Sequence, residues 1–247
     1  MKLLKLLKLT SLQVCLLIIV SCKKEAVTIP VTFTSTTYKP LGGYDSDGKP
    51  DYLVASDTIS STLRTYITNL LPESKDLRNL HPELLNANSI ADIPIHTSAD
   101  VYITYVSNGT GYTNTFGFYT YTTGQSPASA KDIKNITYIF PNAGIYTTLQ
   151  PGAKVHLGRF DAGISLGFVI LQNGWNRNTH TIDSSAVHFC SNDILNPEVA
   201  PSLKKHAVLI NYPEENKVLI GFEDIDRTSS LCDNDFNDMM FYCTVVP

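Results

Sequence analysis

The spacing of apolar residues changes along the chain and separates a helical stretch from a β-rich stretch. Between residues 59 and 71, apolar side chains recur at intervals of three and four residues, which is the repeat of an amphipathic helix. Ser56 or Asp57 is expected to cap the start of this helix, and Pro72 to end it. A second, shorter helix is predicted around residues 77–85, with a break near Pro82.

From residue 99 onward the pattern predicts strands. Short apolar or alternating segments are separated by Gly, Asn and Pro, and they span residues 101–106, 115–122, 136–140, 155–160, 166–172, 186–190, 206–212, 218–222 and 239–246. We therefore predict a mainly β protein, an antiparallel β-sandwich with a short helical N-terminal segment. The expected division is a leader over residues 1–21, a tether and small helical region over 22–98, and a β-sandwich domain over 99–247.

The first 21 residues have the pattern of a lipoprotein signal peptide. A basic region is followed by an apolar stretch and by Ser21, and the apolar run at residues 14–20 is too short to cross a bilayer core of about 30 Å. The segment that ends at Cys22 resembles the bacterial lipobox, so Cys22 is the predicted lipid attachment site and the membrane the predicted partner. Ordinary cleavage that leaves Cys22 as a free thiol is the alternative. The expected location is the bacterial cell envelope, at the outer membrane, with the periplasmic or surface face left open.

Charge and cysteine content narrow the possibilities further. The formal net charge is −4, and without the three lysines of the leader it is near −7, because 16 basic residues then face 23 acidic ones. This balance argues against nucleic acid as a partner, because nucleic-acid binding needs clustered cations. Cys190, Cys232 and Cys243 remain after Cys22. A disulfide between Cys232 and Cys243 and buried free thiols are both compatible with the spacing.

The strongest chemical signal lies between the last two predicted strands. Residues 223–238 hold six acidic residues and one arginine, a net charge of −5. A hairpin would bring the two ends of this loop together, and a hard cation would offset the repulsion between carboxylates. Oxygen ligands favour calcium over transition metals. The predicted calcium ligands are Glu223, Asp224, Asp233, Asp235, Asn237 and Asp238. A solvated acidic loop and a catalytic Mg²⁺ or Mn²⁺ centre are the alternatives.

The same residues carry a family resemblance. Phe222-Glu223-Asp224, followed by Asp233-x-Asp235-Phe236-Asn237-Asp238 and an apolar strand, resembles the signature of the domain of unknown function numbered 4114. That module is similar to the C-terminal part of LruC-type lipoproteins of the Bacteroidetes and also occurs in large calcium-dependent adhesins. The resemblance extends over roughly residues 100–247. It implies a calcium-bound β-sandwich on an exported bacterial protein, without an established enzymatic activity.

Two weaker signals lie outside the acidic loop. Asp45, Asp47 and Asp51 stand at positions 1, 3 and 7 of an Asp-Ser-Asp-Gly-Lys-Pro-Asp segment. This segment resembles the calcium loops of thrombospondin-type repeats, but it is also compatible with a plain turn. Trp175, the only tryptophan, is a possible ligand contact if it stacks on a sugar ring. The alternative is that Trp175 covers one end of the core.

These signals favour a non-catalytic, calcium-stabilised and lipid-anchored cell-envelope protein, an adhesin-type module that binds a surface glycan or protein. A carbohydrate-binding lipoprotein of an uptake system is the main alternative, with Trp175 in the binding platform. A metal-dependent hydrolase built on the acidic loop is the third hypothesis. The sequence predicts no nucleophile elbow between a strand and a helix and no phosphate-binding glycine loop, so we do not expect this protein to be an enzyme.

Overall fold

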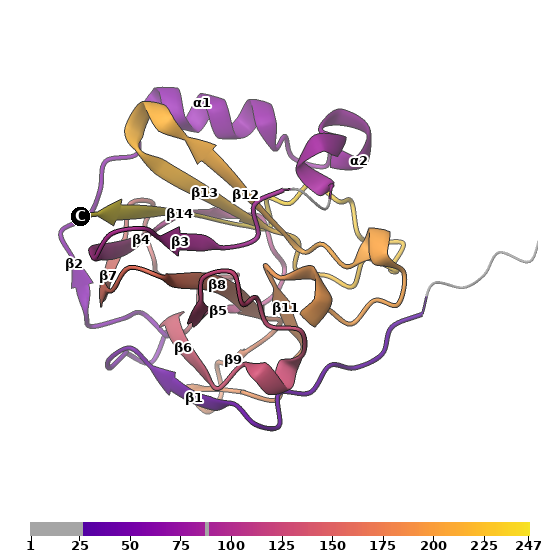
Figure 1. The fold of residues 1–247 in the computed structure, drawn as a ribbon, viewed down its shortest axis with the longest axis horizontal. Coiled ribbons are helices and arrows are strands. Elements are labelled where there is room, and N and C mark those ends of the chain that lie inside the picture. The colour runs from indigo at the N-terminus through magenta and orange to yellow at the C-terminus, as the bar shows by residue number, and fades with distance from the viewer. Residues whose placement is uncertain (1–26, 87–88) are drawn as a thin grey trace, which may run out of the picture.

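The computed structural model describes residues 27–86 and 89–247, and two β-sheets form the body of this part of the chain (Figure 1). The first sheet has the order β1-β6-β5-β8-β11, and β3 shares one edge of β8 with β11. Its strands are β1 (Thr37–Pro40), β3 (Ile93–Ile95), β5 (Thr115–Thr122), β6 (Asn135–Phe140), β8 (Ile164–Leu171) and β11 (His188–Cys190).

The second sheet has the order β12-β13-β14-β4-β7-β2. Its strands are β2 (Leu53–Val54), β4 (Ala99–Asn108), β7 (Lys154–Phe160), β12 (Ala207–Tyr212), β13 (Lys217–Phe222) and β14 (Met239–Val246). A separate hairpin joins β9 (Trp175–Asn176) and β10 (Thr181–Ile182). Apart from the parallel pair β1 and β6, the strand pairs of the described residues are antiparallel.

The two sheets pack face to face through an aromatic core. The ring of Phe116 on β5 stacks on that of Phe241 on β14, with centroids 3.8 Å apart and planes 8° from parallel. Both side chains are fully buried, and stacked aromatic pairs add to the stability that burial already supplies. The prediction of a mainly β sandwich is therefore confirmed.

Helix α1 (Ser61–Leu70) covers the outer face of the second sheet, and α2 (Leu77–Leu80) follows it (Figure 1). Leu63, Ile67 and Leu71 pack in one cluster with side chains of β13 and β14. The predicted N-cap was wrong. The cap is Ser60, whose Oγ accepts from the backbone N–H of Leu63 at 3.0 Å, while the carboxylate of Asp57 is occupied by Lys154 at 2.8 Å.

Residues before position 99 also enter both sheets, through β1, β2 and β3. The N-terminal arm buries Phe33 against the outer face of the first sheet, in a cluster with Tyr119 and Ile136. The outer faces of both sheets are thus covered in part, which explains why strands such as β8 and β14 consist of nearly continuous apolar residues. Short 3₁₀ helices occupy Pro82–Leu85, Ala130–Asp132, Asp193–Leu195, Pro201–Leu203 and Pro213–Glu215. In the described ranges, no helix has the length and apolarity that crossing a membrane requires.

A candidate metal centre at the β13–β14 loop

The hairpin of β13 and β14 closes the acidic segment at one end of these strands, which lie side by side within the second sheet. Phe222 pairs with Met239 in the antiparallel register, so residues 223 and 238 begin and end the loop side by side. The apolar side chains of both strands are buried in the core, and the polar residues of the connecting loop lie beyond the strand ends.

The returning half of the loop has an unusual backbone. Asn234 and Phe236 have φ values of 61° and 59°, and a left-handed conformation is uncommon for a residue other than glycine. Buried groups hold both positions in place. The guanidinium of Arg227 donates from Nε and Nη2 to Asn234 Oδ1 at 2.9 and 2.8 Å, and the ring of Phe236 is fully buried. Such strain persists only where the surroundings impose it, and it often marks functional sites.

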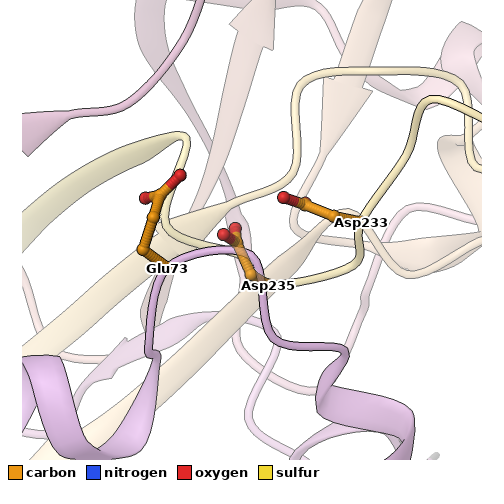
Figure 2. Close-up of side chains that lie close together, drawn as sticks. All are labelled: Glu73, Asp233 and Asp235. Atoms are coloured by element: carbon orange, nitrogen blue, oxygen red, sulfur yellow. The ribbon is translucent and has the colours of Figure 1, made fainter.

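Three carboxylates converge at this loop from two distant segments (Figure 2). Glu73, in the turn after α1, offers a carboxylate oxygen within 4.8 Å of those offered by Asp233 and Asp235. Asp235 is only 2% exposed and is positioned by the backbone N–H groups of Ser74, at 2.7 Å, and Asn237, at 3.0 Å. Burial raises the pKa of its carboxyl to about 6.

Asp224 and Asp238 form a second carboxyl pair where the loop joins the two strands. The backbone N–H of Asp224 donates to Asp238 Oδ2 at 2.9 Å, and the amide of Asn114 donates to the carboxylate of Asp224. Burial and then the neighbouring Asp224 charge raise the pKa of Asp238 to about 9. This pair therefore retains a proton at neutral pH in the metal-free protein.

Glu223 lies beneath the loop and is 1% exposed. Its carboxylate accepts from the thiol of Cys232 at 3.2 Å and from the backbone N–H of Phe236 at 3.4 Å. Burial is the main cause that raises its pKa to about 7, and the charges of Asp233 and Asp235 add to the effect. The buried Glu223 and Asp224 and the half-buried Asp238 thus lie next to the cluster and support the loop.

Asn237 faces a small cleft next to the cluster. Its Nδ2 donates to the carbonyl of Leu71 at 3.2 Å, which ties the loop to the end of α1. A side chain at Gly109 would place its Cβ 3.4 Å from Asn237 Oδ1 and 3.5 Å from Glu73 Oε2. Because Gly109 has no such atom, space is left between these two oxygens, and they line a cavity of about 180 Å³.

The donor chemistry of this centre fits a hard cation. The groups at the cluster and the adjacent cleft are carboxylate and amide oxygens, and the ion pairs of the described residues are formed by other acids. Carboxylates held this close repel one another unless protons or a cation offset their charge. Calcium takes six to eight oxygen ligands in flexible geometry, so the three carboxylates, with Asn237 and water as further donors, suit it.

Sequence reasoning missed Glu73. It predicted Asp233 and Asp235, which the structure brings together, but Glu73 lies about 160 residues earlier and belongs to no motif. The only signal was its position directly after Pro72, at the end of the predicted helix. That position becomes informative once α1 is known to lie against the β13–β14 loop.

The segment of Asp45, Asp47 and Asp51 forms a tight turn. Asp45 Oδ1 accepts from the backbone N–H groups of Asp47 and Lys49, both at 2.9 Å, and Tyr44 pairs with Pro50 across the turn. The carboxylates of Asp45, Asp47 and Asp51 do not gather around one point. Among the described residues, a group of three such side chains close enough to share a metal ion is formed by Glu73, Asp233 and Asp235.

Trp175 lies under this turn instead of on the surface. Its side chain is 2% exposed and meets the ring of Tyr44 edge-on, with centroids 5.5 Å apart. The ring therefore has no open face on which a sugar could stack. This position corresponds to the core-covering alternative that the sequence left open.

The described cysteines form no disulfide. Cys190 and Cys243 are buried, and Cys232 is partly exposed. The sequence left a disulfide and free thiols as alternatives, and in the structure these cysteines are free thiols. The predicted lipid attachment site, Cys22, lies outside the described residues.

Comparison with protein families supports the domain assignment. Residues 160–245 match the model of a family described as a domain of unknown function (DUF4114). The match is narrower than the expected span of about 100–247, and it contains the acidic loop but neither Glu73 nor Gly109. No match was found among the curated proteins or among the solved structures.

Proposed function

We propose that this chain is a non-catalytic, calcium-binding module of a lipid-anchored cell-envelope protein, with an adhesin-type role in binding a surface glycan or protein. The observation that carries the proposal is the convergence of Glu73, Asp233 and Asp235, whose carboxylate oxygens lie within 4.8 Å of one another without a basic partner among the described ion pairs. A bound calcium ion would offset this charge and hold the loop against the end of α1.

The anchoring part of the proposal rests on the leader and Cys22. Acyl chains on this cysteine would hold the module at a membrane, each buried methylene contributing about 0.8 kcal/mol. The lipoprotein context, with LruC-type proteins as the expected relatives and the outer membrane as the expected location, belongs to the same proposal.

Calorimetric titration of calcium into metal-free protein tests the site. We expect wild-type protein to bind calcium and Asp235→Asn to bind it much more weakly, because one charge of the cluster is lost. Glu83→Gln serves as the matched control, because Glu83 is an exposed acid paired only with His81. Equal calcium affinity in the wild type and Asp235→Asn would refute the proposed site.

Gly109→Ala adds a test that leaves every carboxylate in place. The new methyl group would lie in ordinary contact with Asn237 and Glu73 and would fill the space between their oxygens. We expect a folded protein whose melting temperature in chelator is close to that of the wild type but whose calcium affinity is reduced. Unchanged affinity would place the ion away from this cleft.

A further inference from the structure

Four exposed apolar side chains lie where the described part of the chain begins. Val27 and Ile29 are 55% and 63% exposed, and Ile194 and Val199 are 53% and 49% exposed. We call these four residues the N-terminal apolar patch. Large apolar side chains that are exposed together on a protein surface often mark a site that contacts another protein or a membrane.

Backbone pairing places three of the four side chains on one face. Thr28 and Glu198 form an antiparallel bridge, supported by hydrogen bonds from Ile29 N to Pro197 O at 2.7 Å and from Val199 N to Val27 O at 2.9 Å. Because side chains alternate along extended segments, Glu198 points into the core and is fully buried. Val27, Ile29 and Val199 therefore point outward together, and Ile194 lies in the 3₁₀ turn just before this bridge.

The two acidic residues next to the patch each lie against a basic side chain. Asp193 pairs with Lys205 at 3.1 Å, and Glu198 pairs with His206 at 2.7 Å inside the protein. The amine of Lys204 donates to the carbonyl of Asn196 at 2.7 Å. Because Asp193 is ion-paired and Glu198 is fully buried, neither acid presents an unpaired carboxylate to an anionic surface.

The short chain between the patch and the predicted lipid anchor at Cys22 favours the membrane as the partner of the patch. Only four residues, Lys23, Lys24, Glu25 and Ala26, separate Cys22 from Val27, and five extended steps of the backbone reach at most about 17 Å. Two of the four are lysines, which suit the phosphate groups of a bilayer.

We propose that the N-terminal apolar patch docks on the surface of the lipid bilayer that holds the anchor, which fixes the orientation of the module. This inference rests on the proposed acylation of Cys22. An acyl chain and an apolar patch so close together would act as two membrane contacts on one short segment. In Figure 1 the described chain begins at one end of the long axis, and β2 and the end of β14 lie at the opposite end, so docking would direct those elements away from the membrane.

Fluorescence quenching by brominated lipid tests this orientation. The full acylated chain carries an added tryptophan at Val199→Trp or Ile29→Trp, in vesicles of phosphatidylcholine and phosphatidylglycerol with brominated acyl chains. Val54→Trp on β2 is the matched control, because Val54 is also an exposed valine, at 39%. Native Trp175 is buried and contributes the same background to each protein. We expect the two patch variants to lose several-fold more emission than Val54→Trp.

Flotation separates failure of the docking inference from failure of the anchor. If wild-type protein floats with the vesicles but Cys22→Ala does not, and the patch and control tryptophans are quenched equally, the anchor stands and the docking inference is wrong. If wild-type protein does not float, the anchor is wrong and the docking inference falls with it. A dimer in sedimentation that Val199→Asp dissociates, without quenching at the patch, would assign the patch to a second copy of the chain and overturn the inference.

Discussion

His188 shows how the surroundings of one residue determine its ionisation. Its Nδ1–H donates to the carbonyl of Ala186 at 2.7 Å, while Nε2 accepts from the hydroxyl of Tyr38 at 3.0 Å. The ring stacks on Phe33 with centroids 4.4 Å apart. Burial lowers the pKa of His188 to about 4, so the imidazole is neutral in the folded protein at neutral pH.

The lowered pKa predicts a loss of stability in acid. The unfolded chain takes up a proton near pH 6.5, whereas the folded chain does so only near pH 4, so unfolding binds a proton between these values. The contribution of His188 to the free energy of unfolding should therefore fall as the pH drops through this window, by at most about 3 kcal/mol. The carboxyl groups of the acidic loop whose pKa is raised act in the opposite direction, because their contribution rises. Urea unfolding of wild-type protein and His188→Gln at about pH 7 and pH 4.5 measures the difference. An equal change in stability in both proteins would contradict the assignment.

The candidate site shows which residues could be predicted from the sequence. Asp233 and Asp235 belong to one local motif, so their spacing was enough to place them together. Glu73 required knowledge of how α1 packs on the second sheet, and Gly109 is informative only through the space it leaves. Asp224 and Asp238 were also predicted as ligands; in the structure the backbone N–H of Asp224 donates to Asp238, and their place at an ion stays a prediction. Local spacing cannot distinguish a ligand from a buried carboxyl pair.

At the scale of elements, the apolar pattern predicted most of the strands. The bounds of β5 and β14 match the predicted residues 115–122 and 239–246. The two-residue strands β2, β9 and β10 escaped prediction because they are too short to show a period. The parallel pairing of β1 with β6 also escaped prediction, because it depends on the path of the arm across the sheet and not on local sequence.

The start of α1 yields a prediction for this element. Ser60 Oγ accepts from the N–H of Leu63 at 3.0 Å and donates to Glu215 Oε1 at 2.6 Å, which links the helix to the turn between β12 and β13. Ser60→Ala removes both contacts and should lower the free energy of unfolding by about 1 kcal/mol, the usual value of an N-cap. Ser61→Ala is the control, because Ser61 is exposed and serves as no cap. Urea midpoints of the two variants should differ; equal midpoints would refute the role of Ser60.

At the scale of the whole molecule, the proposed ion would join two distant parts of the chain. Glu73 follows α1, while Asp233 and Asp235 lie between the last two strands. The helix already packs on the sheet through Leu63 and Ile67, so calcium would add to an existing contact. Chelation should therefore loosen the end of α1 and the acidic loop without unfolding the core.

Removal of calcium tests this coupling through both stability and local exchange. Calcium at 100 times its Kd stabilises the folded state by about 2.7 kcal/mol, which corresponds to a melting temperature several degrees higher for a chain of this size. Chelator should remove this gain, and hydrogen exchange should rise in residues 70–76 and 223–238 but not in β5 and β8.

The same measurement at lower pH checks the electrostatic cause. Burial raises the pKa of Asp235 to about 6 and that of Glu223 to about 7. As the medium becomes acidic, a proton therefore competes with calcium at Asp235, and protonation of Glu223 removes negative charge beneath the cluster. In metal-free protein, unfolding releases these protons, and lowering the pH from about 7.5 to 5.5 should raise its stability. The gap in melting temperature between calcium-loaded and chelated protein should therefore narrow over this range. A gap that stays constant would mean that the stabilising ion is bound elsewhere.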